Sequence, residues 1–172
     1  FKLNETVLID DYLKGSKIIK KRKYSKTGVV ELTLANGPKI FLKKTDFEKD
    51  SISLTSFSAG GISKANDKVL PSAKVMDSIL VKADIGNLSA SEKENVYPID
   101  FIDVYPSLSE KGESIVGYTN NAFKEDMFKL LYLNFTDLRV KDIHVEQFIK
   151  NELNDYYISK QSPKYNYEVE FK

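Results

Sequence analysis

The stretch that decides the fold is "VVELTLANGPKIFLKKTDFEKDSISLTSFSAGGIS", Val29 to Ser63. Apolar and polar residues alternate on both sides of Asn36-Gly37, a pair typical of tight hairpin turns because both residues accept positive φ. The alternation returns in "DSISLTSFSAGG", which runs into Gly60-Gly61. The pattern predicts three early strands, and hairpin connections imply antiparallel pairing.

A helix is predicted directly after this stretch, over the residues 67–83, "DKVLPSAKVMDSILVKA". Pro71 fits such a helix only if it lies in the first turn. Apolar residues recur at spacings of three and four, which is typical of a helix with one buried stripe. This stripe consists of Val69, Ala73, Met76, Leu80 and Ala83.

The second half of the chain repeats the order of strands followed by helices. Ser89 and Glu92 have the spacing of a capping box that opens a short helix. The segment "DFIDVYPSLSEKGESIVGYTN" predicts a second hairpin that turns at 110–112. Asn120 or Asn121 is expected to cap the helix "AFKEDMFKLLYLNFTDL", whose apolar residues surround it and predict burial on several sides.

A final helix, "KDIHVEQFIKNELNDYYIS", is predicted near the C-terminus, and the tail "KYNYEVEFK" alternates like a short strand. The inner face of this helix would consist of Val145, Phe148, Ile149, Leu153 and Tyr156. Together these patterns predict an α+β domain with an antiparallel sheet and helices packed on one of its faces.

Composition restricts the classes of function. The chain has 172 residues with a net charge of +1, so no overall charge favours binding to nucleic acid. Its apolar runs are much shorter than the roughly 20 residues of a membrane-spanning helix, so no membrane partner is predicted. The absence of cysteine excludes disulfides and zinc sites built on thiolates.

The residues 1–28 have weak periodicity and are interpreted as a linker or N-terminal arm. A basic run lies within them, consisting of Lys17, Lys20, Lys21, Arg22, Lys23 and Lys26. Such a run is also typical of a phosphate-contacting patch or a localisation signal. Because no aromatic-rich sheet or recognition helix follows, a solvated linker is the favoured interpretation.

Candidate catalytic residues are few, because the chain has one histidine, His144. Neither H-E-x-x-H nor H-x-x-E-H occurs, and no serine lies in a G-x-S-x-G context. His144 is interpreted as a surface or helix-flank residue, with a lone general base as the alternative. Gly60-Gly61 is interpreted as a turn or strand kink, since no phosphate-loop motif surrounds it.

The segment "LTLANGPKIFLKKTDFEKDSISLTSFSAGGIS" resembles the opening strands of insulinase-like (pitrilysin-type) zinc peptidase domains. "IGNLSASE" and "VGYTNNAFKEDMFKLLYLNFTDLR" extend the resemblance to the non-catalytic C-terminal half of large bacterial members. It covers about Val29 to Asn154. It implies the α+β fold of a peptidase or mitochondrial-processing-peptidase-like half-domain, placed here at 29–172.

In catalytic halves of this family, the helix after the Gly-Gly strand carries H-x-x-E-H, in which two His bind zinc and Glu activates water. By register, Ala73 and Asp77 occupy the two His positions and Met76 the Glu position. The resemblance therefore implies an inactive half with no catalytic or metal residues and no cofactor of its own. Zinc is expected in a separate catalytic half.

The resemblance also implies partners. An inactive half of this family lines a peptide chamber that it forms with the catalytic half. The alternatives are a structural or assembly subunit with the same fold, as in respiratory-complex core subunits, and an unrelated binding module with a basic arm.

Some expectations concern the parent protein. The chain opens on Phe1 and a family half-domain is typically longer, so a fragment of a larger bacterial peptidase is expected, with a short member as the alternative. Large bacterial members are often periplasmic, and the resemblance implies that compartment by analogy. A sheet edge left exposed in such a fragment would permit association between copies.

Overall fold

The structure, a computed structural model, describes residue 9 and residues 14–170. It divides into two compact units, one formed by Ile9–Ser51 and one that contains the residues from Ile52 onward.

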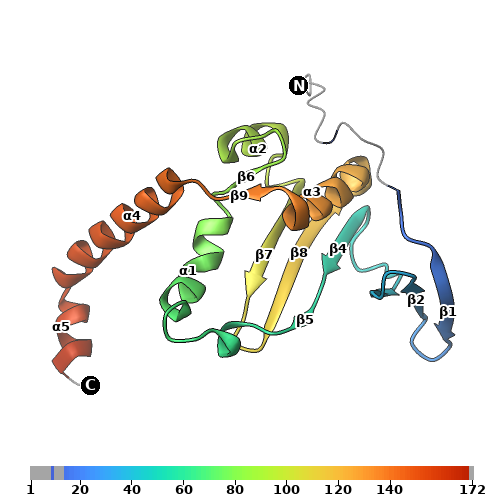
Figure 1. Ribbon diagram of the computed structural model, residues 1–172, viewed down its shortest axis with the longest axis horizontal. Coiled ribbons are helices and arrows are strands. Elements are labelled where there is room, and N and C mark those ends of the chain that lie inside the picture. The colour runs from blue at the N-terminus through green and yellow to red at the C-terminus, as the bar shows by residue number, and fades with distance from the viewer. Residues whose placement is uncertain (1–8, 10–13, 171–172) are drawn as a thin grey trace. The chain divides into compact units, whose positions relative to one another are not determined.

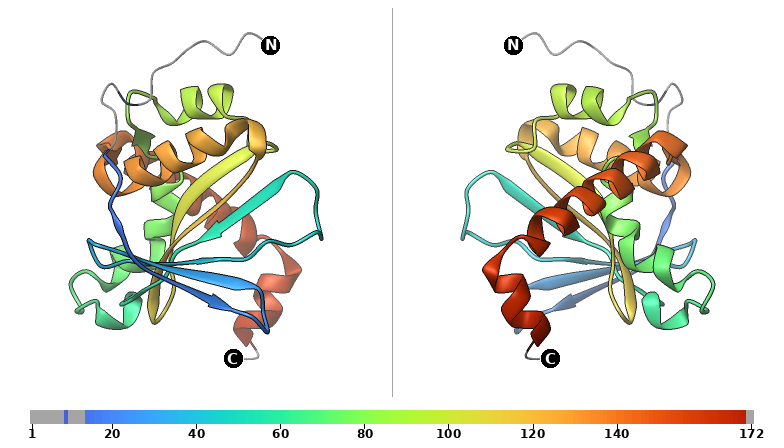
Figure 2. Two further views of the ribbon diagram at one scale, coloured as in Figure 1. Left: turned by 90° about the vertical axis from the view of Figure 1, so that its right-hand side faces the viewer. Right: turned by 90° about the vertical axis from the view of Figure 1, so that its left-hand side faces the viewer.

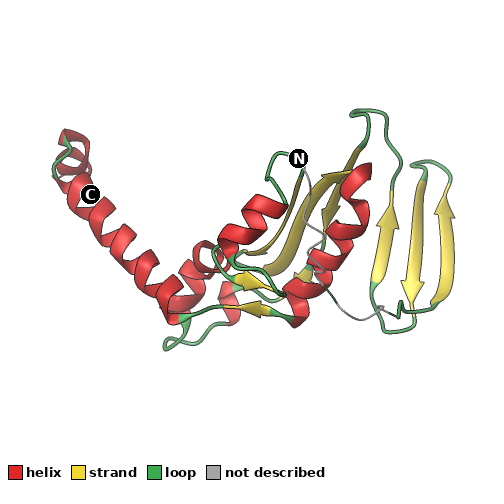
Figure 3. Ribbon diagram, turned by 90° about the horizontal axis from the view of Figure 1, so that it is seen from above, coloured by secondary structure: helices red, strands yellow, loops and turns green. Residues whose placement is uncertain are grey.

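The Ile9–Ser51 unit is a three-stranded antiparallel sheet in the order β1-β2-β3 (Figure 3). Its strands are β1 (Ile18–Tyr24), β2 (Val29–Leu34) and β3 (Lys39–Leu42). The predicted β2–β3 hairpin is confirmed, although Gly37 alone supplies the positive φ, at 105°. The prediction of a linker is wrong for residues 18–24, because the main chain of this basic run pairs along β2.

The second unit is built on a four-stranded sheet in which β8 (Gly112–Asn120) is central. β7 (Ile102–Leu108) and β5 (Ser58–Ala59) pair antiparallel with it, and β4 (Ser51–Thr55) also lies beside it. The β7–β8 hairpin occurs where the sequence predicts it.

Helices pack on this sheet as Figure 1 shows: α1 (Leu70–Leu80) lies against β7, and α3 (Lys124–Thr136) lies against β7 and β8. The α+β fold is therefore confirmed. Along the chain, β6 (Asp84–Ile85) and α2 (Ala90–Val96) come between α1 and α3. β6 pairs antiparallel with β9 (Leu138–Arg139), which follows α3. The short 3-10 turns Ile62–Lys64 and Asn121–Phe123 precede α1 and α3.

The core lies between α3 and β7. Ile102 and Val104 alternate with more exposed neighbours along β7, and both are almost fully buried. Met127, Leu130 and Leu133 meet them from one stripe of α3, whereas Phe135 on the same helix is 71% exposed. The prediction that this helix is buried on several sides is therefore wrong.

The C-terminal helices differ most from the predictions. α4 (Asp142–Lys160) contacts α1 and then α5 (Pro163–Glu170), as Figure 2 shows, and no residue of α4 is fully buried. Ile149 and Leu153, predicted for its inner face, are each about half exposed. The predicted strand in the tail is wrong, because residues 163–170 are helical. In the described part of the chain, no helix has the length and apolarity required to cross a membrane.

Candidate functional site

Helix α1 contains Ala73, Met76 and Asp77, the residues that the sequence analysis predicts at the zinc-motif positions. Pro71 lies in its first turn, where a missing N–H costs little. Ala73 and Met76 are half-buried and offer no group that activates water. In the residues that the structure describes, no three His, Cys, Asp or Glu side chains group together as a metal site would require.

The carboxylate of Asp77 is held by β7. Leu108 N donates to Oδ1 at 2.8 Å and to Oδ2 at 2.9 Å, and the Ser107 hydroxyl donates to Oδ2 at 3.3 Å. Both oxygens therefore accept hydrogen bonds from the end of the strand. The side chain fastens α1 to β7 in the place where the resemblance would put a zinc ligand.

Gly60 and Gly61 pack closely against the turn between β7 and β8. Gly61 has φ 80°, and a Cβ on it would lie 2.3 Å from Ser109 O, so only glycine fits. The next amide, Ile62 N, donates to Ser109 O at 3.0 Å. The pair packs against the β7–β8 turn, as the interpretation of a turn predicts.

An ion pair that the sequence analysis missed lies at β6, between a buried carboxylate and an exposed lysine. Asp84 is 4% exposed, its Oδ2 is 2.5 Å from Lys141 Nζ, and Ala90 N donates to Oδ1 at 3.3 Å. The hydrogen bond from Lys141 holds the pKa of the Asp84 carboxyl below its usual value, against the opposing effect of burial. No short-range pattern reveals the pair, because the two residues are far apart in the chain.

His144 completes this group, which we name the Asp84 cluster (Asp84, Lys141 and His144). Its side chain is 11% exposed, with Nε2 3.6 Å from Asp84 Oδ1. Nδ1 accepts from Lys141 N at 3.1 Å, which assigns the proton of the neutral ring to Nε2. The helix-flank position at the start of α4 is as predicted, but the side chain faces a buried carboxylate.

This arrangement engages both ring nitrogens of His144 within the fold. A general base needs a free nitrogen lone pair within reach of a substrate proton. The lone pair of Nδ1 is engaged by a backbone N–H, and Nε2 faces Asp84. The cluster instead joins the start of α2, through Ala90, to the start of α4.

A groove of about 460 Å³ lies between α2 and the strands β7 and β8. Its lining includes Tyr97, Tyr105 and Tyr118, together with the Lys93–Asp103 ion pair, whose charged atoms are 3.1 Å apart. Burial raises the pKa of Tyr97, so its hydroxyl stays protonated at neutral pH. The groove offers apolar ring surface and hydrogen-bonding groups of the kind that a peptide side chain uses.

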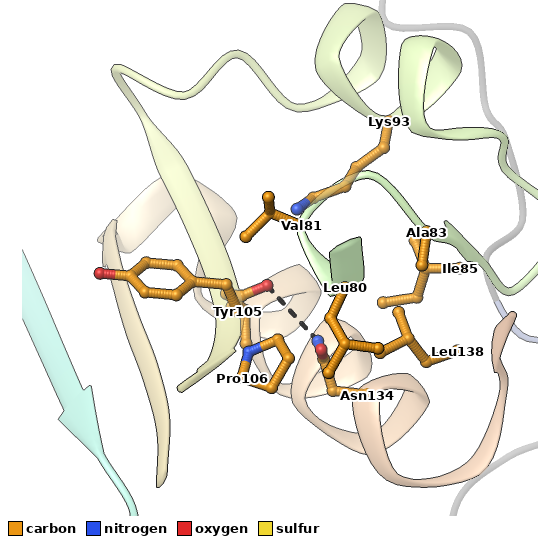
Figure 4. A pocket seen from close by; sticks show the side chains of 10 residues that line it. Leu80, Val81, Ala83, Ile85, Lys93, Tyr105, Pro106, Asn134 and Leu138 are labelled. Carbon is orange, nitrogen blue, oxygen red and sulfur yellow. Dashed lines mark hydrogen bonds between the residues drawn. The ribbon is translucent and has the colours of Figure 1, made fainter. Parts of the chain in front are cut away.

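A second cavity, shown in Figure 4, is too small for a peptide. Its volume is about 10 Å³, roughly the space of one water molecule. Leu80, Ile85 and Leu138 contribute apolar walls, and Asn134 donates to Val104 O at 3.4 Å across one side. It is a packing gap between α1, α3 and β7.

Comparisons with known proteins agree with the predicted resemblance. No protein-family model matches the chain. A "Zinc protease PQQL-like" of Arabidopsis thaliana is 49% identical over 41 residues, which are 24% of this chain. The crystal structure of the periplasmic protease PqqL from Escherichia coli superposes on 95% of the chain with a TM-score of 0.77 and 16% identity.

A second solved structure is similar over 94% of the chain, with a TM-score of 0.73 and 14% identity. It is the ferredoxin protease FusC, an E83A mutant in complex with Arabidopsis ferredoxin. The chain spans 18% of each solved protein and its match spans 4% of the Arabidopsis relative. The chain therefore has the fold of a segment of these solved proteases.

Proposed function

We propose that this chain is a non-catalytic domain of a zinc-dependent metallopeptidase. In this proposal, the residues 29–172 form part of the wall of a peptide chamber. A separate catalytic half that carries H-x-x-E-H completes the chamber and holds the zinc. Peptide bonds are cleaved in that half, and this chain contributes contacts to the peptide.

The observation that carries the proposal is helix α1 within a protease-like fold. The fold matches that of PqqL over nearly the whole chain. In this proposal, Ala73, Met76 and Asp77 occupy the positions of the motif. Catalytic zinc needs three protein ligands and an activated water. Asp77 directs both oxygens to β7, so its carboxylate is committed to the fold.

The groove beside α2 supports the peptide contacts. Its size suits one large side chain of an extended polypeptide, and its tyrosine rings offer apolar surface with hydroxyl groups at their ends. The solved relatives act on protein substrates, as the name ferredoxin protease states for FusC. Peptides or unfolded protein segments are therefore the proposed substrate class of the parent protein.

A periplasmic location is part of the proposal, because the solved relative PqqL is a periplasmic protease. The alternative function is a structural or assembly subunit with the same fold and no role in peptide cleavage. The Asp84 cluster, which joins α2 to α4, agrees equally well with that alternative.

The test compares the chain alone with the chain plus the catalytic half of its parent protein. We expect the isolated chain to bind no stoichiometric zinc in equilibrium dialysis and to cleave no peptide in a fluorogenic peptide library. Addition of the chain to the catalytic half should increase cleavage, and a Tyr105→Ala variant should increase it less.

Two results would contradict the proposal. One zinc per isolated chain, with cleavage that a chelator abolishes, would make this chain catalytic. Unchanged cleavage on addition of the chain, despite formation of a stable complex, would favour the structural subunit. A Lys43→Ala variant serves as the control, since Lys43 lies in the other unit and does not line the groove.

A further inference from the structure

The hairpin geometry determines which backbone groups of β7 point away from β8. Ser109 N donates to Gly112 O at the turn, so these residues form a hydrogen-bonded pair. The register continues from Leu108 opposite Glu113 without a shift, and hydrogen-bonded pairs alternate with non-bonded ones. The residues whose backbone nitrogens face outward are therefore Leu108, Pro106, Val104 and Ile102.

These outward groups form the outer edge of β7, and the half of this edge nearest the β7–β8 turn has no free backbone N–H. Leu108 N donates to both oxygens of Asp77, at 2.8 and 2.9 Å. Pro106 has no N–H to offer. The Ser107 hydroxyl also donates to Asp77, which fixes the orientation of the carboxylate across the end of the strand.

The backbone nitrogens in the other half of the edge also have hydrogen-bond partners. Val104 N donates to Asp103 Oδ1 at 2.9 Å, and Val104 O accepts from Asn134 Nδ2 at 3.4 Å (Figure 4). Ile102 N donates to Pro98 O at 3.2 Å in the preceding turn. Every outward backbone nitrogen of β7 is thus bonded within its own unit or carries no hydrogen.

We propose that these side chains seal the outer edge of β7 against strand addition, and that Asp77 closes its end nearest the turn. A strand that joins a sheet must accept hydrogen bonds from the edge N–H groups. At β7 such a strand would first have to displace a carboxylate from Leu108. An extended peptide, or a second copy of this chain, is therefore excluded from this edge.

The proposal assigns a chemical role to the position where the zinc motif is absent. The carboxylate of Asp77, one helical turn beyond Ala73, reaches the edge of β7. It also refines the expected association between copies, which must use a surface other than this edge. The proposal does not rest on a peptidase function, and its test measures no cleavage.

Amide hydrogen exchange of the 172-residue chain, followed by NMR at low and high protein concentration, tests the proposal. We expect the amides of Ile102, Val104 and Leu108 to be protected equally at both concentrations. An Asp77→Ala variant should exchange the Leu108 amide about tenfold faster or more, with Val104 unchanged. Asp77→Asn is the matched control, because its carbonyl oxygen still accepts from Leu108 N.

Protection that rises with concentration in the wild-type chain would show that another copy covers the edge, and would overturn the proposal. Unchanged exchange of Leu108 in a folded Asp77→Ala variant would overturn the role of Asp77. If that variant does not fold, Pro106→Val provides the second test, because its new outward amide has no cap. We expect this amide to exchange rapidly at low protein concentration. Protection at that concentration would contradict the proposal, because a group other than these side chains would then cover the edge.

Discussion

At the scale of single residues, the buried carboxylate of Asp84 links the stability of the fold to pH. Lys141 lowers its pKa in the folded chain, so the ionised form is favoured by folding. The carboxylate therefore contributes stability above its unfolded pKa, near 4, and this contribution is lost as the pH falls through the folded pKa. We expect Asp84→Asn to lower the free energy of unfolding by about 1–2 kcal/mol at neutral pH.

Urea unfolding of the wild-type chain and of Asp84→Asn, measured from neutral pH to below pH 4, checks this prediction. The difference between them should shrink as the pH falls below about 4, because protonated Asp84 no longer attracts Lys141. Glu94→Gln is the matched control, since Glu94 and its partner Lys82 are both about two-thirds exposed. A difference that stays constant with pH would show that the ion pair does not stabilise the fold.

At the scale of secondary-structure elements, α3 and α4 both contain leucines that differ in burial. Leu130 on α3 is fully buried, and Leu153 on α4 is 50% exposed. We expect Leu130→Ala to reduce the free energy of unfolding by about 3 kcal/mol through loss of contacts and a residual cavity. Leu153→Ala should cost less than about 1 kcal/mol, because half of its side chain already contacts solvent.

The same measurement, urea unfolding, compares the two variants directly. Because the substitution is identical, helix propensity changes equally and the difference reports burial. Equal losses of stability would mean that the Leu153 face of α4 is covered in solution.

The contrast between these helices shows what the sequence could predict. Strict alternation and the Asn36-Gly37 turn predicted the hairpin, because these signals act over a few residues. The capping box of Ser89 and Glu92 was predicted for the same reason, and Glu92 N donates to Ser89 Oγ at 3.3 Å. Periodicity also predicted that α4 has an apolar face, but burial of that face depends on the rest of the fold.

The candidate site was predictable in part. Register along α1, together with the family resemblance, led to the prediction that Ala73, Met76 and Asp77 occupy the zinc-motif positions, and this stays a prediction. The register did not reveal that Asp77 reaches Leu108, or that Asp84 meets Lys141, because both contacts depend on how distant segments pack. The prediction of a linker at residues 18–24 also failed. Their charge pattern does not reveal that their main chain pairs with β2, because strand pairing depends on a partner elsewhere in the chain.

At the scale of the whole molecule, the buried apolar side chains belong to one of the two units. The buried core runs from Ala83 to Leu133, whereas no described residue of Ile9–Ser51 is fully buried. A three-stranded sheet without a buried face has little stability of its own.

We therefore expect a fragment of residues 52–172 to unfold cooperatively in urea with native-like helical circular dichroism, and a fragment of residues 9–51 to show no cooperative transition. The 52–172 fragment with Leu130→Ala is the control, because loss of that core residue should lower its midpoint. A disordered 52–172 fragment would show that the core needs the other unit in order to form.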